Sequence, residues 1–147
     1  MNTSIATLLA GKGRALHTVP TNVTVIEAVQ KMNQHKVGAI LVMDGDQLSG
    51  IFTERDVLTR VIAGSLDPKT TPLARVMTAN VLTVAPDITV QEVMDIFADK
   101  RCRHLPVIDG GKVVGLISIG DVSRWVANAH RAEAESLRSY IAGGLTT

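Results

Sequence analysis

The stretch Gly50-Ile51-Phe52-Thr53-Glu54-Arg55-Asp56 decides the fold, because it returns 65 residues later as Gly115-Leu116-Ile117-Ser118-Ile119-Gly120-Asp121. The same offset holds without a gap from Thr18 to Val57, and 11 of these 40 positions are identical to their partners. Composition alone would give roughly two or three identities. The chain therefore contains two copies of one supersecondary unit, which we expect to bury their apolar faces against each other about a pseudo-two-fold axis.

Each copy has the pattern β-α-β-β-α. A short β-like run at 15–19 and 81–84 is followed by a proline-containing turn and by helical spacing, clearest from Val90 onward. Two further β runs, at 37–43 with 48–52 and at 105–108 with 113–117, flank the tight turns Asp44-Gly45-Asp46 and Asp109-Gly110-Gly111. Such turns between apolar runs predict hairpins. The fold class is therefore α/β of the α+β kind, with helices packed on small sheets.

The order of these patterns predicts the domain organisation. We expect an N-terminal helical segment at 1–14, a first repeat at 15–64, a linker at 65–77 and a second repeat at 78–126. A C-terminal helix and tail occupy 127–147, within one long helix that runs from Val122 to about Ala142 and ends at Gly143-Gly144. Its apolar stripe is equally compatible with capping its own domain and with packing across a dimer interface. In the homodimer we expect two apolar helix faces to pair with a second copy, one ending in Val57, Val61 and Ile62 and the other beginning with Val122, Trp125 and Val126.

Composition favours a soluble cytoplasmic protein. The 147 residues are 46% hydrophobic and 20% charged, and a formal charge of +1 gives no electrostatic reason to expect nucleic acid or an acidic membrane surface as a partner. No apolar run approaches the roughly 20 residues that span a bilayer, and the N-terminus lacks a signal-peptide pattern. The single Cys102 excludes an intrachain disulfide and suits a reducing compartment. The four histidines show no metal-ligand spacing, and no cofactor motif is present.

The repeated motif has two interpretations. Thr53-x-x-Asp56 and Ser118-x-x-Asp121 match a capping box, in which a hydroxyl and a carboxylate satisfy free N–H groups at a helix start. The same elements suit a nucleoside phosphate, because the helix start favours an anion and the carboxylate can accept hydrogen bonds from a ribose diol. Both copies place the motif directly after a strand that begins with glycine, which favours the second interpretation.

The paired β-α-β-β-α units, with a Gly-x-x-[Ser/Thr]-x-x-Asp motif after the third strand, resemble a tandem of cystathionine-β-synthase (CBS) domains, called a Bateman module. The segments 76–78 and 103–109 are also similar to that family. The resemblance implies a stand-alone bacterial signalling module that is not an enzyme. It implies binding of AMP, ADP, ATP or an NAD-type dinucleotide in clefts between the repeats, a homodimer and an unidentified effector protein.

The resemblance also implies site residues, with the motif of one repeat meeting the early strands of the other. In the first site, Ser118 and Asp121 would meet Thr18, Val37, Gly38 and Ala39. In the second, Thr53 and Asp56 would meet Thr83, Cys102, Arg103 and His104. The candidate phosphate cations are Lys36, Arg55, Arg103 and His104. Because Arg55 has Gly120 as its counterpart, we expect the two clefts to differ in charge and in ligand.

Three functions are compatible with the sequence. The favoured one is a regulatory module that senses adenine nucleotides and signals through a dimer. The second is a structural or protein-interaction module whose clefts stay empty, so that the motifs act only as caps. The third is a small nucleotide hydrolase, but the sequence contains no Walker lysine and no nucleophile–base pair to support it.

Overall fold

The computed structural model describes residues 2–12 and 16–145, and they form two compact units that do not coincide with the two repeats. The sheet unit comprises 16–85 and 105–116, and the helical unit comprises 2–12, 86–104 and 117–145.

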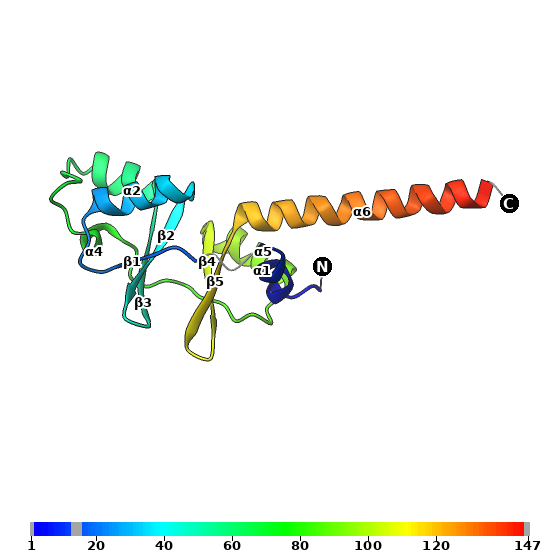
Figure 1. The fold of residues 1–147 in the computed structure, drawn as a ribbon, viewed down its shortest axis with the longest axis horizontal. Helices are drawn as coiled ribbons and strands as arrows, with labels where there is room; N and C mark the ends of the chain where they lie inside the picture. Colours follow the sequence, from blue (N-terminus) through cyan, green and yellow to red (C-terminus); the bar gives the residue numbers. More distant parts are fainter. Residues whose placement is uncertain (1, 13–15, 146–147) are drawn as a thin grey trace. The chain divides into compact units, whose positions relative to one another are not determined.

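The first repeat forms a three-stranded sheet in the order β1-β2-β3. Strand β1 (Thr18–Pro20) runs parallel to β2 (Ala39–Asp44), and β2 is antiparallel to β3 (Gln47–Thr53). Helix α2 (Val25–His35) lies between β1 and β2 in the chain and covers one face of the sheet (Figure 1). After β3 come the short α3 (Glu54–Asp56), the π-helical segment η1 (Val57–Ile62) and α4 (Leu73–Val76).

Successive side chains of a strand point to opposite faces of the sheet, and apolar side chains cover both faces, so the sheet has two apolar layers. On one face Ile40, Val42 and Phe52 pack with side chains of α2, η1 and α4. On the other, Ala39, Leu41 and Ile51 pack with Val113 and Leu116, among others. The first layer includes Leu73 and Val76 from the segment expected to be a linker. That segment is also hydrogen-bonded to the first repeat, with the Val25 N–H donating to the Thr71 carbonyl at 3.0 Å.

The second repeat contributes the hairpin of β4 (His104–Asp109) and β5 (Lys112–Ser118). The predicted strand at 81–84 is wrong as an extended element, because only Val84 pairs, in parallel, with Val107. The first repeat shows the reason: there the Leu41 N–H donates to the His17 carbonyl at 3.3 Å. The counterpart of Leu41 is Pro106, which has no N–H to donate.

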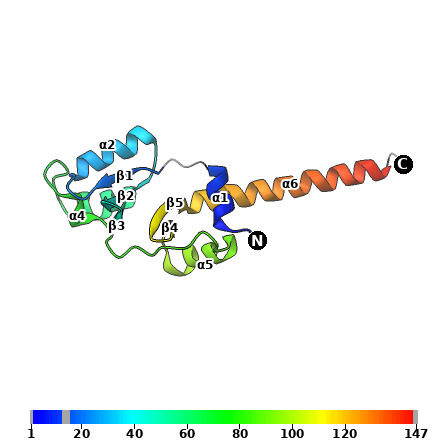
Figure 2. The same cartoon turned by 60° about the horizontal axis from the view of Figure 1, so that its bottom comes forward.

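The helical unit contains α1 (Ile5–Lys12), α5 (Val90–Lys100) and α6 (Ile119–Leu145) (Figure 2). Backbone hydrogen bonds tie the start of α1 to the segment before α5: the Ile5 N–H donates to Ile88 at 2.8 Å, and the Val90 N–H donates to Thr3 at 2.8 Å. Apolar residues of all three helices are buried, namely Ile5, Leu8, Val90, Val93, Phe97 and Val122. Helix α1 lies within the N-terminal segment 1–14 that the sequence predicts to be helical, of which residues 1, 13 and 14 are outside the described residues.

Helix α6 is longer than predicted. It passes through Gly143-Gly144 and ends at Leu145, because glycine stops a helix only where it takes a left-handed C-cap conformation. Its second half extends beyond α1 and α5 (Figures 1 and 2), and there Leu137, Tyr140 and Ile141 are exposed. Two residues that we expected at a dimer interface, Val61 and Val122, are instead buried inside their own units. The exposed apolar residues of η1 are Leu58 and Ile62.

Candidate functional site

Both copies of the motif form a capping box in the structure. In the first, the Thr53 N–H donates to Asp56 Oδ2 at 3.0 Å, and the Asp56 N–H donates to Thr53 Oγ1 at 3.3 Å. In the second, the Ser118 N–H donates to Asp121 Oδ2 at 2.8 Å, and the Asp121 N–H donates to Ser118 Oγ at 3.1 Å. Both aspartates are buried, with residue exposures of 8% and 9%. The capping interpretation is therefore realised, and each carboxylate is held at the turn where a strand becomes a helix.

The glycine that opens the first motif is required by a close backbone approach. Ile51 exchanges hydrogen bonds of 3.0 and 2.9 Å with Thr78, which brings the 77–78 segment against β3. A Cβ atom at Gly50 would lie 2.6 Å from the Thr78 carbonyl oxygen and 2.8 Å from the Met77 sulfur. Because real Cβ atoms do not approach so closely, any side chain here would push the segment away from the strand that carries Thr53.

Arg60 lies beside Asp56, one helical turn further on. Its Nε is 3.6 Å from Asp56 Oδ1, which makes an ion pair but is too long for a hydrogen bond. Its Nη1 donates instead to the carbonyls of Val76 and Met77, at 3.2 and 3.1 Å. The guanidinium thus binds the end of α4, and no hydrogen-bond donor within residues 2–12 and 16–145 reaches Asp56 Oδ1.

Asp121 has two closer cations. Lys12 Nζ donates to its Oδ2 at 2.7 Å, and Arg124 Nη2 donates to its Oδ1 at 2.5 Å. Burial raises the pKa of Asp121, but the hydrogen bonds from Lys12 and Ser118 and the Lys12 charge outweigh burial and lower the pKa below its ordinary value. The second carboxylate is therefore ionised and already neutralised by the chain itself.

Within each repeat, the motif is hydrogen-bonded to the residue that directly precedes the neighbouring strand, β2 in the first repeat and β4 in the second. The Glu54 N–H donates to the Gly38 carbonyl at 3.0 Å, and the Ile119 N–H donates to the Arg103 carbonyl at 2.9 Å. Ala39 also pairs with Thr53 in the register of β2 and β3. These two positions, Gly38 and Arg103, are counterparts in the 65-residue repeat. The further grouping of each motif with residues of the other repeat stays a prediction.

The other predicted site residues of the first repeat lie around the same sheet. Thr18 begins β1, and its carbonyl accepts a hydrogen bond from Lys31 Nζ. Lys36 is the left-handed C-cap of α2, with φ 54°, and the half-buried Val37 follows it. Arg55 is exposed in the first turn after Thr53. A ligand role for each of these residues stays a prediction.

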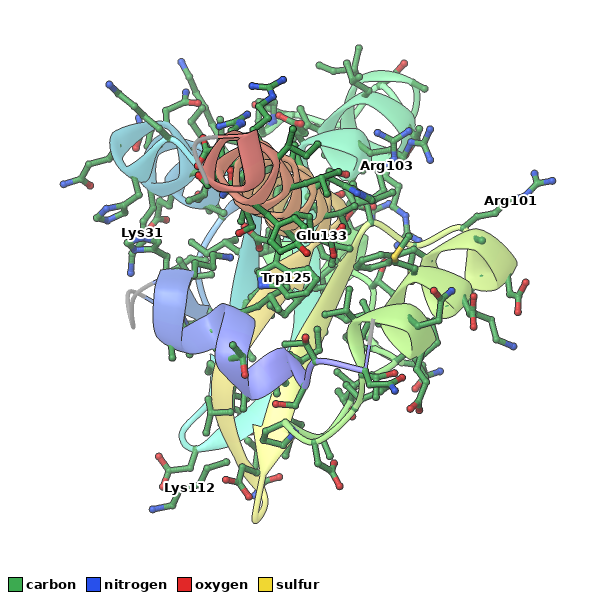
Figure 3. All side chains as sticks on the ribbon, turned by 90° about the vertical axis from the view of Figure 1, so that its right-hand side faces the viewer. Lys31, Arg101, Arg103, Lys112, Trp125 and Glu133 are labelled. Atoms are coloured by element: carbon green, nitrogen blue, oxygen red, sulfur yellow. The ribbon has the colours of Figure 1, made fainter. Side chains whose placement is uncertain are left out.

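In the second repeat, Arg101 repeats the C-cap geometry of Lys36, with φ 53°, and its side chain points away from α5 (Figure 3). Cys102 is half-buried, and burial raises the pKa of its thiol, so a nucleophilic role finds no support. Arg103 is exposed and His104 is half-buried at the start of β4. Their role as phosphate cations stays a prediction.

Thr83 lines a different hollow. A cavity of about 180 Å³ in the sheet unit is bounded by residues of both hairpins and of the segment before β4: Gln47, Leu48, Ala79, Val81, Thr83, Ile108, Gly111 and Val113. Gln47 and Leu48 begin β3, whereas Thr53 ends it, and at about 3.3 Å per residue these ends lie roughly 17–20 Å apart. The structure therefore places Thr83 with the far end of β3.

Three cations that contact the motif carboxylates are absent from the predicted set. Arg60 and Arg124 follow their aspartates by four and three residues, a helical spacing from which both contacts were predictable. Lys12 lies 109 residues before Asp121, and no local spacing indicates that contact. The sequence around it, Gly11-Lys12-Gly13-Arg14, lacks the third glycine of a dinucleotide fingerprint and the Gly-Lys-Ser/Thr end of a P-loop, so it does not indicate a phosphate site.

The described residues also bear on metal binding and on membrane spanning. Within residues 2–12 and 16–145, no three His, Cys, Asp or Glu side chains gather so that they could hold a metal ion. No helix in this part of the chain is both long enough and apolar enough to cross a membrane.

Comparisons with known proteins agree with the repeat. The family model described as "CBS domain" matches twice, at residues 13–63 and 73–128. The chain is 39% identical to the CBS domain-containing protein CBSX3, mitochondrial, of Arabidopsis thaliana, over 97% of this chain and 74% of that protein. A solved protein with CBS domains from Burkholderia ambifaria is 42% identical, with a TM-score of 0.81, over 84% of this chain and 93% of that one.

One further solved structure and one longer relative are similar to the chain. A CBS domain protein from Pyrobaculum aerophilum, solved in complex with AMP, has a TM-score of 0.73 over 81% of this chain and 89% of that one. At 24% identity this likeness shows the fold alone. The chain spans only 19% of a longer Arabidopsis relative, CBS domain-containing protein CBSCBSPB1, to which it is 37% identical over 69% of its own length.

Proposed function

Because the chain belongs to the CBS domain family, as a tandem pair, we propose that it is a non-catalytic regulatory module that binds an adenine nucleotide through its Gly-x-x-[Ser/Thr]-x-x-Asp motifs. The ligand class is AMP, ADP, ATP or NAD(H). The observation that carries the proposal is a buried carboxylate, fixed at a strand-to-helix turn and present in both repeats. A ribose diol needs such a rigid acceptor, since two neighbouring hydroxyls bind one carboxylate best when it is held in place.

The first motif is the better supported of the two. Asp56 Oδ2 accepts one hydrogen bond, from Thr53, and Oδ1 accepts none from the described residues, since Arg60 is 3.6 Å away. An ionised carboxylate offers about four acceptor positions. Asp56 therefore keeps the capacity that two ribose hydroxyls require. The Thr53 hydroxyl and the exposed Arg55 lie next to it in the chain, where a phosphate would find a donor and a positive charge.

The fold is also compatible with such a ligand. The Pyrobaculum protein holds AMP in a structure of this type, although its likeness to this chain extends to the fold alone. Signalling to an effector protein, and a cytoplasmic location, belong to the same proposal and rest on the family resemblance.

Calorimetric titration with AMP tests the proposal. We expect Asp56→Asn to weaken AMP binding about 10- to 150-fold, the equivalent of roughly 1.5–3 kcal/mol for hydrogen bonds to a charged group. The matched control is Asp109→Asn, an exposed aspartate at the end of β4. An AMP affinity that is the same in wild type and Asp56→Asn contradicts ribose recognition by Asp56. No binding of any adenine nucleotide to wild type favours an interaction module whose motifs are only caps.

The proposed module is a homodimer. Leu58 and Ile62 are four residues apart in η1 and are 66% and 62% exposed, so one face of that segment presents apolar surface to water. Pairing two such faces removes that surface from water at about 25 cal/mol per Å². We expect light scattering to give about twice the 15.7 kDa mass of the chain. Replacing both residues with glutamate should return the mass of one chain.

A further inference from the structure

The two motifs differ most in what the chain itself places on the carboxylate. Asp121 Oδ2 accepts hydrogen bonds from both the Ser118 N–H and Lys12 Nζ, and Oδ1 accepts one from Arg124. Counting donors in the described part of the chain, Asp121 thus uses three of about four acceptor positions, whereas Asp56 uses one. A ribose diol needs two positions, and the second motif has room for one.

Lys12 is held on Asp121 by the fold of the helical unit. It is the last residue of α1, and the buried Ile5 and Leu8 anchor the helix. Backbone hydrogen bonds from Ile5 and Ala6 to Ile88 and Pro86, at 2.8 and 2.9 Å, fix its start. Figure 3 shows Trp125 of α6 on the side that faces α1. The contact therefore joins two packed helices and is not the chance meeting of two surface side chains.

The Lys12 contact is also stronger than an ordinary surface ion pair. The Asp121 side chain is 7% exposed and that of Lys12 is 38% exposed, so the pair is partly shielded from water. A charge-assisted hydrogen bond of 2.7 Å in such a setting is about twice as strong as a neutral one. Arg124, by contrast, is 71% exposed, and its side chain is freer to leave Oδ1. Lys12 is thus the harder of the two cations to displace.

Given the proposed function, on which this step rests, we propose that Lys12 is an intramolecular competitor for ribose at the second motif. Ser118–Asp121 binds the diol of a nucleoside only when Lys12 has left Asp121 Oδ2. Thr53–Asp56, which has no such competitor among the described residues, binds a nucleoside first. The N-terminal helix α1 is thereby the element that sets the difference in affinity between two otherwise matched motifs.

Adenosine is the probe that separates this effect from phosphate attraction, because it carries the diol without a charge. The background variant is Asp56→Asn, which removes ribose capture at the first motif. In that background we compare Lys12→Met, which keeps the length of the side chain and removes the donor, with Lys12→Arg, which keeps a donor. Lys112→Met is the matched control, since Lys112 is an exposed lysine in the second hairpin (Figure 3).

We expect calorimetry to show that Lys12→Met raises adenosine affinity in the Asp56→Asn background about tenfold or more, the scale of a displaced charge-assisted hydrogen bond. Lys12→Arg and Lys112→Met should leave it unchanged. Far-UV circular dichroism of each variant establishes that the helices are retained, and Lys12→Arg supplies a readout if Lys12→Met does not fold, because a gain in affinity there overturns the proposal.

Each remaining outcome is decisive. If wild type binds adenosine and Lys12→Met gives no gain, the competition is overturned and the proposed function stands. If Lys12→Met weakens binding, Lys12 is a ligand contact and the competition is again overturned. If Asp56→Asn binds adenosine as tightly as wild type, the proposal that Thr53–Asp56 binds a nucleoside before Ser118–Asp121 is overturned. If no form of the protein binds adenosine, AMP or ATP, the proposed function fails and the competition fails with it.

Discussion

The two motifs have the same local hydrogen bonds and opposite surroundings. Thr53–Asp56 ends a strand of the three-stranded sheet and leads into a three-residue helix and a π-helical segment. Ser118–Asp121 ends a hairpin strand and starts a 27-residue α-helix. The first aspartate forms one long ion pair with Arg60, whose hydrogen bonds go to other carbonyls, and the second accepts hydrogen bonds from two cations. A repeated motif thus fixes the geometry of a carboxylate, and the residues around it decide what that carboxylate can bind.

The largest effect should come from the glycine that positions the first motif. Gly50→Ala places a Cβ atom 2.6 Å from the Thr78 carbonyl, and relief requires a backbone shift in the core. We expect urea denaturation to show a loss of about 2–3 kcal/mol, the scale of overpacking.

Gly45→Ala is the control for Gly50→Ala. Gly45 has φ +59° but nothing within 4 Å of its Cβ position, so only the left-handed backbone opposes alanine. That conformation costs roughly 1–2 kcal/mol. A Gly50→Ala variant as stable as wild type would show that the 77–78 segment does not press on β3.

A smaller effect should separate the two aspartates. Asp121→Asn removes the negative charge that pairs with Lys12 and Arg124. We expect it to lower the free energy of unfolding at pH 7 by about 1–2 kcal/mol. Asp56→Asn disturbs a cap and one long ion pair, and should cost about 0.5–1 kcal/mol. Equal losses would show that Lys12 and Arg124 add nothing to the second cap.

The stability difference between wild type and Asp121→Asn should also depend on pH. The pKa of Asp121 is lowered in the folded state, so its contribution is present above the ordinary value of 3.8 and is lost as pH falls through the lowered value. Urea titrations between pH 6 and pH 3 should therefore show wild type and Asp121→Asn converging as the pH falls. A gap that stays constant over this range would contradict an ionised, ion-paired Asp121.

Much of this arrangement was predictable from spacing within one repeat. The capping boxes, the hairpin turns and the position of α2 follow from residues three to eight positions apart, where local geometry acts. Residues that correspond in the two repeats also have the same local structure: Thr24 and Thr89 both cap their helices, and Gly45 and Gly110 both have a positive φ. These features need only the backbone of one unit.

The errors have non-local causes. The strand at 81–84 fails because Pro106, more than twenty residues later, withholds a hydrogen bond. Val61 and Val122 have the right pattern for an exposed helix face, but they are buried inside their own units. Lys12 joins Asp121 across 109 residues, and no periodicity connects them. Tertiary packing therefore determines which predicted strand forms and which apolar residues are exposed. It also determines how the two candidate sites differ, since the contact of Lys12 with Asp121 is non-local.

The smallest predicted effect belongs to the first repeat alone. The rings of His17 and His35 stack with centroids 3.9 Å apart, whereas the corresponding residues of the second repeat are Leu82 and Lys100. Burial, and then the nearby His35 and Lys31, lower the pKa of His17. The folded state therefore favours neutral His17, so its contribution to stability is full above the ordinary pKa of 6.5 and is lost as pH falls through the lowered value.

Unfolding in urea at pH 5, 6, 7 and 8 measures this effect. We expect wild type to lose stability below pH 6.5, and His17→Gln to lose less of it over the same range because the titrating ring is gone. His130→Gln is the matched control, since His130 is 74% exposed on α6 and stacks on no ring among the described residues. If His17→Gln keeps the full slope of wild type while His130→Gln reduces it, the pH response belongs to the helical unit, and the stacked pair does not distinguish the first repeat from the second.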